Sequence, residues 1–329
     1  MTAHLAELAQ LGARAEATPG TFLLPGTADV KNLVRNPSYE AIVAKTDRNS
    51  RSSSLSQYPQ VGAAIGGQIG FEIDLYSAGQ AALPVWGVLA KACGFANVTG
   101  GTSAAWVFNL KSIQDGSGGA IPTVSLSLNV DGYVHKLGGC RGNMKIKATA
   151  GGPLMAEFTF QGRHETPTDT AMQAWTADTN AGDLPDFTSA AVALAAVTGS
   201  EALTASEAIL EGFEFDLGNE LYLRPSANDA TGFDHCVITR RRPKITIDPE
   251  WVTVAAFDAI KALKQDDILD FTTGSLTGKG ANNNIQIDAN RVQLASVGRQ
   301  ERSGVAVQSL ELLPTRTASD DEVTITIAA

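Results

Sequence analysis

The sequence predicts a mainly β protein made of two similar halves, each carrying one helix. Composition, a two-residue apolar period and a repeated order of elements support this fold class. Charged residues make up 18% of the chain and apolar residues 43%, so charges are scarcer than the roughly 25% of typical globular proteins. Val, Ile, Thr and Gly are frequent instead, which favours sheets and turns over long exposed helices.

Several segments show the alternation of a half-buried strand. In residues 63–77, apolar side chains recur mostly at every second position, which is the period of a strand. Residues 124–130 (VSLSLNV) alternate as well, and Asp131-Gly132 behind them is a hairpin turn signal. We therefore expect antiparallel strands joined in a meander.

Two helices are expected between these strands. The first covers residues 83–93, where Pro84 fits the first helical position and Gly94 fits the position just past the end. The second would begin after Asp248, with Asp248 as the N-cap and Pro249 as the first helical residue. Each helix has one apolar face, so each should cover a sheet.

Two further local patterns give less usual predictions. Residues 1–20 have leucines at helical spacing and end in Thr-Pro-Gly, which predicts a short helix or a loose arm. Residues 283–288 and 291–297 both alternate, so we expect them to form a hairpin around Ala289-Asn290.

The order of elements in the first half recurs in the second half. Two pairs of positions are separated by 174 residues and a later pair by 152 residues, because the first half has longer loops. Any β-rich chain shows chance matches, but the agreement of six elements in order favours a true duplication. The matched pairs are Tyr39 with Phe213, Ile73 with Ile247, and Phe158 with Leu310.

This repeat predicts the domain boundaries. Residues 1–175 would form the first domain together with an N-terminal arm, residues 176–205 a linker, and residues 206–329 the second domain. A duplicated sheet has edge strands that need covering, and closed rings are the usual way in which identical chains cover them.

Bulk properties narrow the possible functions. The net charge of −10 disfavours tight DNA binding, which needs an excess of Lys and Arg; it fits either simple solubility or a surface that DNA slides past. Cys93, Cys140 and Cys236 lie far apart, which argues against a disulfide framework and a zinc site. The first residues lack a signal-peptide pattern, and no apolar run is long enough to predict a membrane span.

No constellation of residues predicts catalysis. The histidines His4, His135, His164 and His235 lack the spacing of a metal site. His235 and Cys236 are neighbours on an expected strand and would face opposite sides, so a Cys–His pair is disfavoured. The sequence therefore predicts a protein that is not an enzyme, with no catalytic, cofactor-binding or metal-binding residues.

Four segments carry a resemblance to a known family. They resemble tail tube (major tail) proteins of long, flexible-tailed, siphovirus-type bacteriophages, and the likeness runs in order over residues 15–315. The segments are 70–95, which includes PVWGVLAKACGF, 131–162, 211–225 and 240–250. The resemblance implies tail-tube-like β-sandwich or split-barrel domains, each flanked by one α-helix.

The resemblance also implies a role in assembly. Such proteins form rings that stack into a tube through which phage DNA passes, and the duplication suggests a trimer acting as a pseudo-hexamer. The implied partners are the chain itself and other tail proteins, such as the tape measure and terminator proteins, with DNA only transiently in the lumen and no membrane. The protein would reside in the virion after synthesis in the host bacterial cytoplasm.

Long loops are the expected contacts between rings or subunits. By position these are residues 46–60 and about 225–236, although plain flexible loops are the alternative interpretation. A basic patch at residues 240–244 is a further candidate for ion pairing between rings. The candidate contact residues are Arg48, Arg51, Tyr58, Arg240, Arg241 and Arg242.

Two other functions stay open at this point. A tandem β-sandwich adhesin or carbohydrate-binding module would be a stable monomer with clustered exposed aromatics, and the aromatic content of 6% counts against it. A terminator or baseplate hub of a phage tail would share much of the fold, and the number of copies per virion would separate it from a tube.

Overall fold

A computed structural model gives the fold of most of the chain. It describes residues 9–26, 29–43, 46–47, 60–62, 64–76, 83–84, 86–101, 104–112, 121–172, 184–265, 267–277, 284–317 and 320–328. This part is mostly antiparallel β structure with two helices, α1 (Trp86–Cys93) and α2 (Ala259–Gln265). The mainly β fold class predicted from the sequence is confirmed.

The strands of the first half are β1 (Ala9–Ala15), β2 (Val30–Leu33), β3 (Arg35–Val43), β4 (Thr46–Asp47), β5 (Gln60–Val61), β6 (Ile65–Asp74), β7 (Asn97–Gly101), β8 (Ala104–Asn109), β9 (Val124–Val130), β10 (Tyr133–Thr149) and β11 (Met155–Asp169). Those of the second half are β12 (Ala193–Ala196), β13 (Gly212–Asp216), β14 (Asn219–Pro225), β15 (Phe233–Arg241), β16 (Lys244–Ile247), β17 (Ile268–Thr272), β18 (Leu276–Thr277), β19 (Asn284–Arg302), β20 (Val305–Pro314) and β21 (Thr324–Ala328).

Both halves have the same order of strands. The first half runs β1-β9-β10-β11-β6-β3, and every neighbouring pair is antiparallel. The second half runs β12-β17-β19-β20-β16-β13 in the same manner. Helix α1 packs on β10, and α2 packs on β19 at the equivalent place. Shared topology is what a duplication would leave behind.

The strand register corrects two matched pairs of the sequence comparison, each by two residues. Phe158 is paired with Phe71, and Leu310 is paired with Ile247. If Phe158 and Leu310 are equivalent, the counterpart of Ile247 is Phe71 and not Ile73. Tyr39 is paired with Ile69 and Phe215 with Ile245, so in the same alignment Tyr39 is the counterpart of Phe215 and not of Phe213. The error of two residues leaves every side chain on its predicted face, because the side-chain period of a strand is two.

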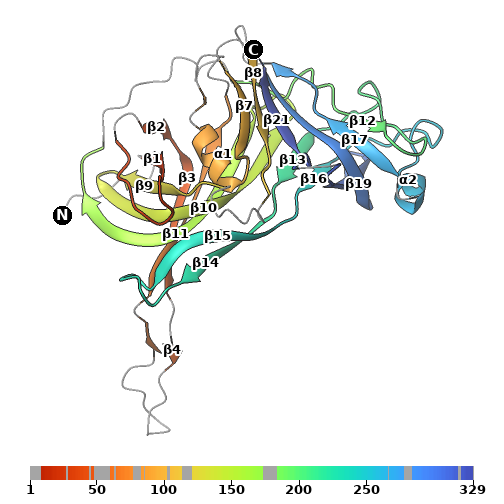
Figure 1. Cartoon of the computed structure of the whole chain (residues 1–329). Helices are drawn as coiled ribbons and strands as arrows, with labels where there is room; N and C mark the ends of the chain where they lie inside the picture. Colours follow the sequence, from red (N-terminus) through yellow and green to blue (C-terminus); the bar gives the residue numbers. More distant parts are fainter. Residues whose placement is uncertain are drawn as a thin grey trace.

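Two strand pairs join the halves into one body (Figure 1). The last residues of β10 pair with β13, with Ile146 opposite Phe215. At the other side, β21 near the C-terminus pairs with β8, with Ile325 opposite Phe108. The result is a curved sheet in which β3, β6, β11, β10, β13, β16, β20 and β19 follow one another without a break.

Aromatic side chains fill the core on one face of this sheet. The rings of Phe71 and Phe158 stack with centroids 5.6 Å apart. Phe95, just behind α1, contacts Phe215 of the second half edge-on at 6.3 Å. These rings are nearly or fully buried, so the apolar core passes from one half into the other.

Helix α1 ends where the sequence predicted but begins at Trp86, two residues after Pro84, and α2 also begins later than predicted. Gly94 ends α1 with a φ of 118°, as its position suggested. Asp248 is not an N-cap, because its carboxylate accepts the N–H groups of Glu211 and Gly212. Asp258 instead accepts the N–H of Lys261 in the first turn of α2.

Two other local predictions were wrong. Residues 9–15 form β1, not a helix or arm, because β1 pairs along its whole length with β9. Residues 284–302 form the single strand β19, not a hairpin around Ala289-Asn290. The turn lies later, at Ser303-Gly304, where both residues have positive φ. In contrast, the turn at Asp131-Gly132 is confirmed, again with positive φ at both positions.

Because the core crosses the β10–β13 pair, we expect the two halves to unfold together. Phe215→Ala should lower the free energy of unfolding by about 3–5 kcal/mol and should speed amide exchange in both β10 and β16. Thermal unfolding followed by hydrogen exchange measures this. Tyr222→Ala, which changes a side chain that is 49% exposed, is the control. Two separate transitions, with β10 protected in the Phe215→Ala protein, would contradict the prediction.

Candidate assembly surfaces

The face of the long sheet opposite the core is polar across both halves. Along β6, β11, β13, β16, β20 and residues 143–149 of β10, most core-facing residues alternate with side chains that are half-buried or exposed. Acidic side chains outnumber basic ones among the charged residues of these strands. The acidic residues are Glu72, Asp74, Glu157, Glu165, Asp169, Glu214, Asp216 and Glu311, and the basic ones are Lys136, Arg141, Lys145, Lys147, Arg163 and Lys244.

Many of these charges are paired across neighbouring strands. Lys147 Nζ lies 2.7 Å from Glu157, and Lys145 Nζ lies 3.1 Å from Asp216 across the β10–β13 pair. Burial alone would raise the pKa of Asp216, but hydrogen bonds from Asn143, the Gly218 N–H and Lys145 outweigh it and hold the pKa below its usual value. The polar face is therefore a ladder of compensated charges with an acidic excess.

The long sheet that runs from β3 to β19 has, at each of its two ends, a strand edge with no partner among the described residues. The outer edge of β3 is one, since β3 pairs only with β6. The other is the last part of β19, residues 296–302, which pairs only with β20. Unpaired backbone groups of this kind are a template for another strand. The two edges lie at opposite ends of the same sheet.

A two-stranded hairpin, β14–β15, leaves the sheet of the second half and lies against the first half (Figure 1). The chain bends out of β13 at Gly218, whose φ of 64° suits glycine, and it returns to β16 past Arg242-Pro243. The bend separates β13 from β14 on the way out, and β15 from β16 on the way back. At the tip of the hairpin, Ile65 donates its N–H to the Thr231 carbonyl at 2.9 Å.

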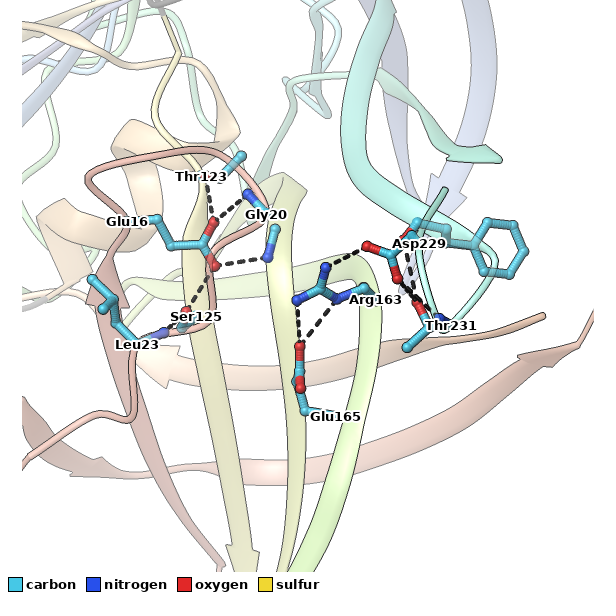
Figure 2. A network of polar contacts seen from close by, with 11 residues as sticks. Glu16, Gly20, Leu23, Thr123, Ser125, Arg163, Glu165, Asp229 and Thr231 are labelled. Atoms are coloured by element: carbon cyan, nitrogen blue, oxygen red, sulfur yellow. Dashed lines mark hydrogen bonds and ion pairs between the residues drawn. The ribbon is translucent and has the colours of Figure 1, made fainter. Parts of the chain in front are cut away.

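Arg163 of β11 fixes the tip of this hairpin (Figure 2). Its Nη1 donates to Asp229 at 2.6 Å, and its Nε and Nη2 both donate to Glu165. Partial burial opposes ionisation of Asp229, yet hydrogen bonds from the N–H and Oγ1 of Thr231 and the charge of Arg163 hold the pKa of Asp229 below its usual value. Because Asp229 belongs to the second half, this cluster ties the halves together.

A second polar cluster fastens the segment behind β1 (Figure 2). The buried carboxylate of Glu16 accepts hydrogen bonds from Thr123 Oγ1 and Ser125 Oγ, both at 2.7 Å. It also accepts the N–H groups of Gly20 at 2.9 Å and Gly139 at 2.7 Å. Four donors to one carboxylate offset the cost of burying its charge. The first strands are therefore held firmly on β9 and β10.

The predicted contact residues fall into different surroundings. Arg48, Arg51 and Tyr58 lie outside the described residues, as does most of the loop 46–60. The Arg241 side chain is 7% exposed and is bound within the chain, to Glu322 at 3.2 Å and to the Lys111 carbonyl. Arg240 and Arg242 are exposed on the surface, so their role as contacts between subunits stays a prediction.

The cysteines and histidines form no reactive arrangement in the described chain. Burial raises the pKa of Cys236 to about 11, so its thiol remains protonated. Its neighbour His235 lies 3.0 Å from Asp234. Among the described residues, no group of three or more His, Cys, Asp or Glu side chains could hold a metal ion. No helix in the same residues has the length and apolar character needed to span a bilayer.

Because both ends of the long sheet have an unpaired edge, a strand of another chain can extend the sheet at either end. The chain belongs to the phage tail tube protein family, whose profile it matches over residues 7–327. A search of curated proteins gave no match. Membership of this family makes the protein a structural component of the phage tail tube and of the virion.

The Arg163–Asp229 ion pair gives a test of hairpin docking. A lowered pKa in the folded state means that the Asp229 carboxylate contributes fully above about pH 4, its unfolded pKa, and that the contribution is lost as the pH falls through the folded value. Asp229→Asn should therefore loosen the hairpin at neutral pH by about 1–2 kcal/mol and remove part of its acid sensitivity. Hydrogen exchange of residues 221–237, corrected for intrinsic rates, measures this.

Glu220→Gln is the matched control on the same hairpin, because Glu220 lies on the surface 3.8 Å from Arg240. It should leave exchange unchanged. Equal exchange in the wild type and the Asp229→Asn protein at every pH would show that the ion pair does not hold the hairpin.

Proposed function

We propose that three copies of the chain close into a ring, that each half occupies one of six equivalent places, and that stacked rings form the tube through which phage DNA passes. The observation that carries this proposal is the repeated strand order with one unpaired edge at each end. The β10–β13 pair within the chain serves as a template for the joints between chains. Division into domains 1–175 and 206–329 with a linker at 176–205 is part of the proposal, with β12, inside that linker, completing the sheet of the second domain.

The width of the sheet supports three copies better than two. Eight strands spaced by about 4.8 Å span about 38 Å per copy. Three copies would then give a ring about 37 Å across, and two copies about 24 Å. Side chains on both walls remove about 10 Å from each diameter. Strand tilt widens both rings, but only the larger leaves comfortable room for a DNA duplex.

The polar face of the sheet is the proposed wall of the lumen. Its paired charges and acidic excess repel phosphate weakly and offer no cluster of free cations that would hold DNA. The opposite face is occupied by the core and the helices. In this arrangement α1 and α2 lie on the outside of the ring, and DNA meets only the ladder of compensated charges.

We propose further that the tail is of the siphovirus type, that the tube contacts tape measure and terminator proteins, and that the chain is synthesised in the host cytoplasm. Residues 46–60 and the hairpin around 225–236 are the proposed contacts with adjacent rings. β4 supports this, because it lies well away from both helices and beyond the body of the sheet (Figure 1).

Assembly itself is the first test. Purified protein at rising concentration should pass from monomer to rings and tubes of three-copy units, seen by mass photometry and negative-stain microscopy. The adhesin alternative predicts a monomer at every concentration that binds glycans. Closed rings that never stack, together with a low copy number in virions, would favour a terminator or hub.

Reversing charge on the proposed lumen wall should slow DNA passage. The double variant Glu157→Lys, Glu214→Lys adds cations to the polar face, so we expect intact tails that retain DNA, with genome release slowed by about tenfold or more at low salt and less at high salt. Asp169→Lys, at the far end of β11, is the control for one acid-to-lysine substitution and changes the charge by half as much as the double variant. Unchanged release from the double variant would place the lumen on another face.

A further inference from the structure

An exposed apolar groove lies beside the unpaired edge of β19. It has a volume of about 260 Å³ and is lined by residues that precede and begin α2 and by the neighbouring part of β19 and β20. Trp251 is 50% exposed, Val254 72% and Ile260 60%. Three large apolar side chains gathered in one place mark an interaction surface more often than chance exposure.

The equivalent place in the first half is closed. Val297 is paired with Leu310, and Met144 is paired with Phe158. Because Leu310 is the counterpart of Phe158, Val297 is the counterpart of Met144. Two residues further along each strand, Arg299 is the counterpart of Ile146. Met144 and Ile146 are fully buried, because β13 continues the sheet beside them and Phe215 packs against the residues behind α1. In the second half, no described strand performs this task.

We propose that this groove and the β19 edge receive the β3 edge of a second copy of the chain. This inference rests on the proposed ring and adds its polarity, register and apolar anchor. The occupant is a second copy because β3 is the counterpart of β13 in the repeated strand order. Its outer edge is unpaired among the described residues, as β13 would be without β10.

The seam within the chain fixes the register of the seam between chains. Lys147 lies opposite Glu214 in the β10–β13 pair. In the repeated strand order, Gln300 is the counterpart of Lys147, and Ser38 is the counterpart of Glu214. Ser38 of one copy should therefore lie opposite Gln300 of the next copy. One residue further along, Tyr39 comes opposite Arg299. Trp and Arg are the residue types that most often anchor interfaces, and here Trp251 and Arg299 line the same groove.

The test has two parts that use the full chain. In the first, Ser38→Cys is combined with Gln300→Cys. Opposed residues of an antiparallel pair have Cα atoms about 4.5–5.5 Å apart, which suits a disulfide, so mild oxidation of assembled protein should give covalent dimers and trimers. Ser38→Cys with Ser309→Cys is the control, since Ser309 lies one strand further in, on β20. Native Cys93, Cys140 and Cys236 are buried, and the wild type measures their background.

In the second part, Val254→Asp places a carboxylate in the groove, where assembly would bury it without a partner. The concentration needed for ring formation should rise by about tenfold or more. Val197→Asp, on a valine that is 49% exposed away from the groove, should change it by less than about twofold. Melting curves of the monomers check that both variants fold.

The outcomes separate this inference from the proposed function. Rings in the wild type, with no cross-link between positions 38 and 300 and normal assembly of Val254→Asp, would overturn the groove as the seam and leave the ring standing. A wild type that stays monomeric at all concentrations would overturn the ring itself. Cross-linked multimers together with weakened assembly of Val254→Asp would support both.

Discussion

Pairing of backbone groups at the edges of one sheet is the constraint on which the rest of this structure depends. Each strand edge presents N–H and C=O groups that must find partners or face water. Inside the chain, β10 meets this demand through β13, and β8 meets it through β21. These two pairs bring together segments from different halves. A core that crosses the same seam then makes the halves inseparable in packing as well as in hydrogen bonding.

Two polar clusters attach segments that the strand pairs between the halves do not hold. The β14–β15 hairpin departs from the sheet, so it needs a separate attachment, and Arg163 supplies this through Asp229. Glu16 does the same for the chain behind β1. Both carboxylates are satisfied by several donors, so each fixes a direction of approach as well as adding stability. In both cases charge-assisted hydrogen bonds hold a segment outside the main core, and in the hairpin they act together with a small apolar cluster of Leu223, Phe233 and Cys236.

The sequence predicted those features that are written locally. Helix α1 is bounded by Pro84 and Gly94, and the turn at Asp131-Gly132 needs positive φ, so both could be placed from composition and period. Helix α2 could not, because residues 249–251 hydrogen-bond to β20, as in the Trp251 N–H to the Ala306 carbonyl. No local sequence pattern in that stretch indicates a hydrogen-bond partner more than fifty residues away in the chain. Asp258, whose carboxylate accepts the Lys261 N–H in the first turn of α2, lies later in the chain than the predicted cap Asp248 and was missed.

The candidate site divides in the same way. Glu72 and Glu214 each stand between apolar residues in the sequence, which is the pattern of a strand with one polar face, and the structure extends that face across both halves. Arg163 and Asp229 were missed, since they are distant in sequence and belong to no motif. The Asp-x-Thr turn at Asp229–Thr231 was the only local signal. The unbroken strand β19 was also missed, because its pairing on both sides with β17 and β21 overrides the weak turn tendency of Ala289-Asn290.

A seam within a chain and a seam between chains meet different requirements, and the two ends of this sheet differ accordingly. The inner seam never faces water in the folded protein, so it can hold Met144, Ile146 and Ala148, all buried. The outer edge must remain soluble before any partner arrives. Arg299 and Glu301 stand at the corresponding positions and are exposed, while apolar area is confined to the groove around Trp251. Charged side chains on an edge also discourage pairing out of register. The residues of this edge therefore fit a surface that becomes covered only on assembly, by one particular strand, better than they fit a surface that stays exposed to water.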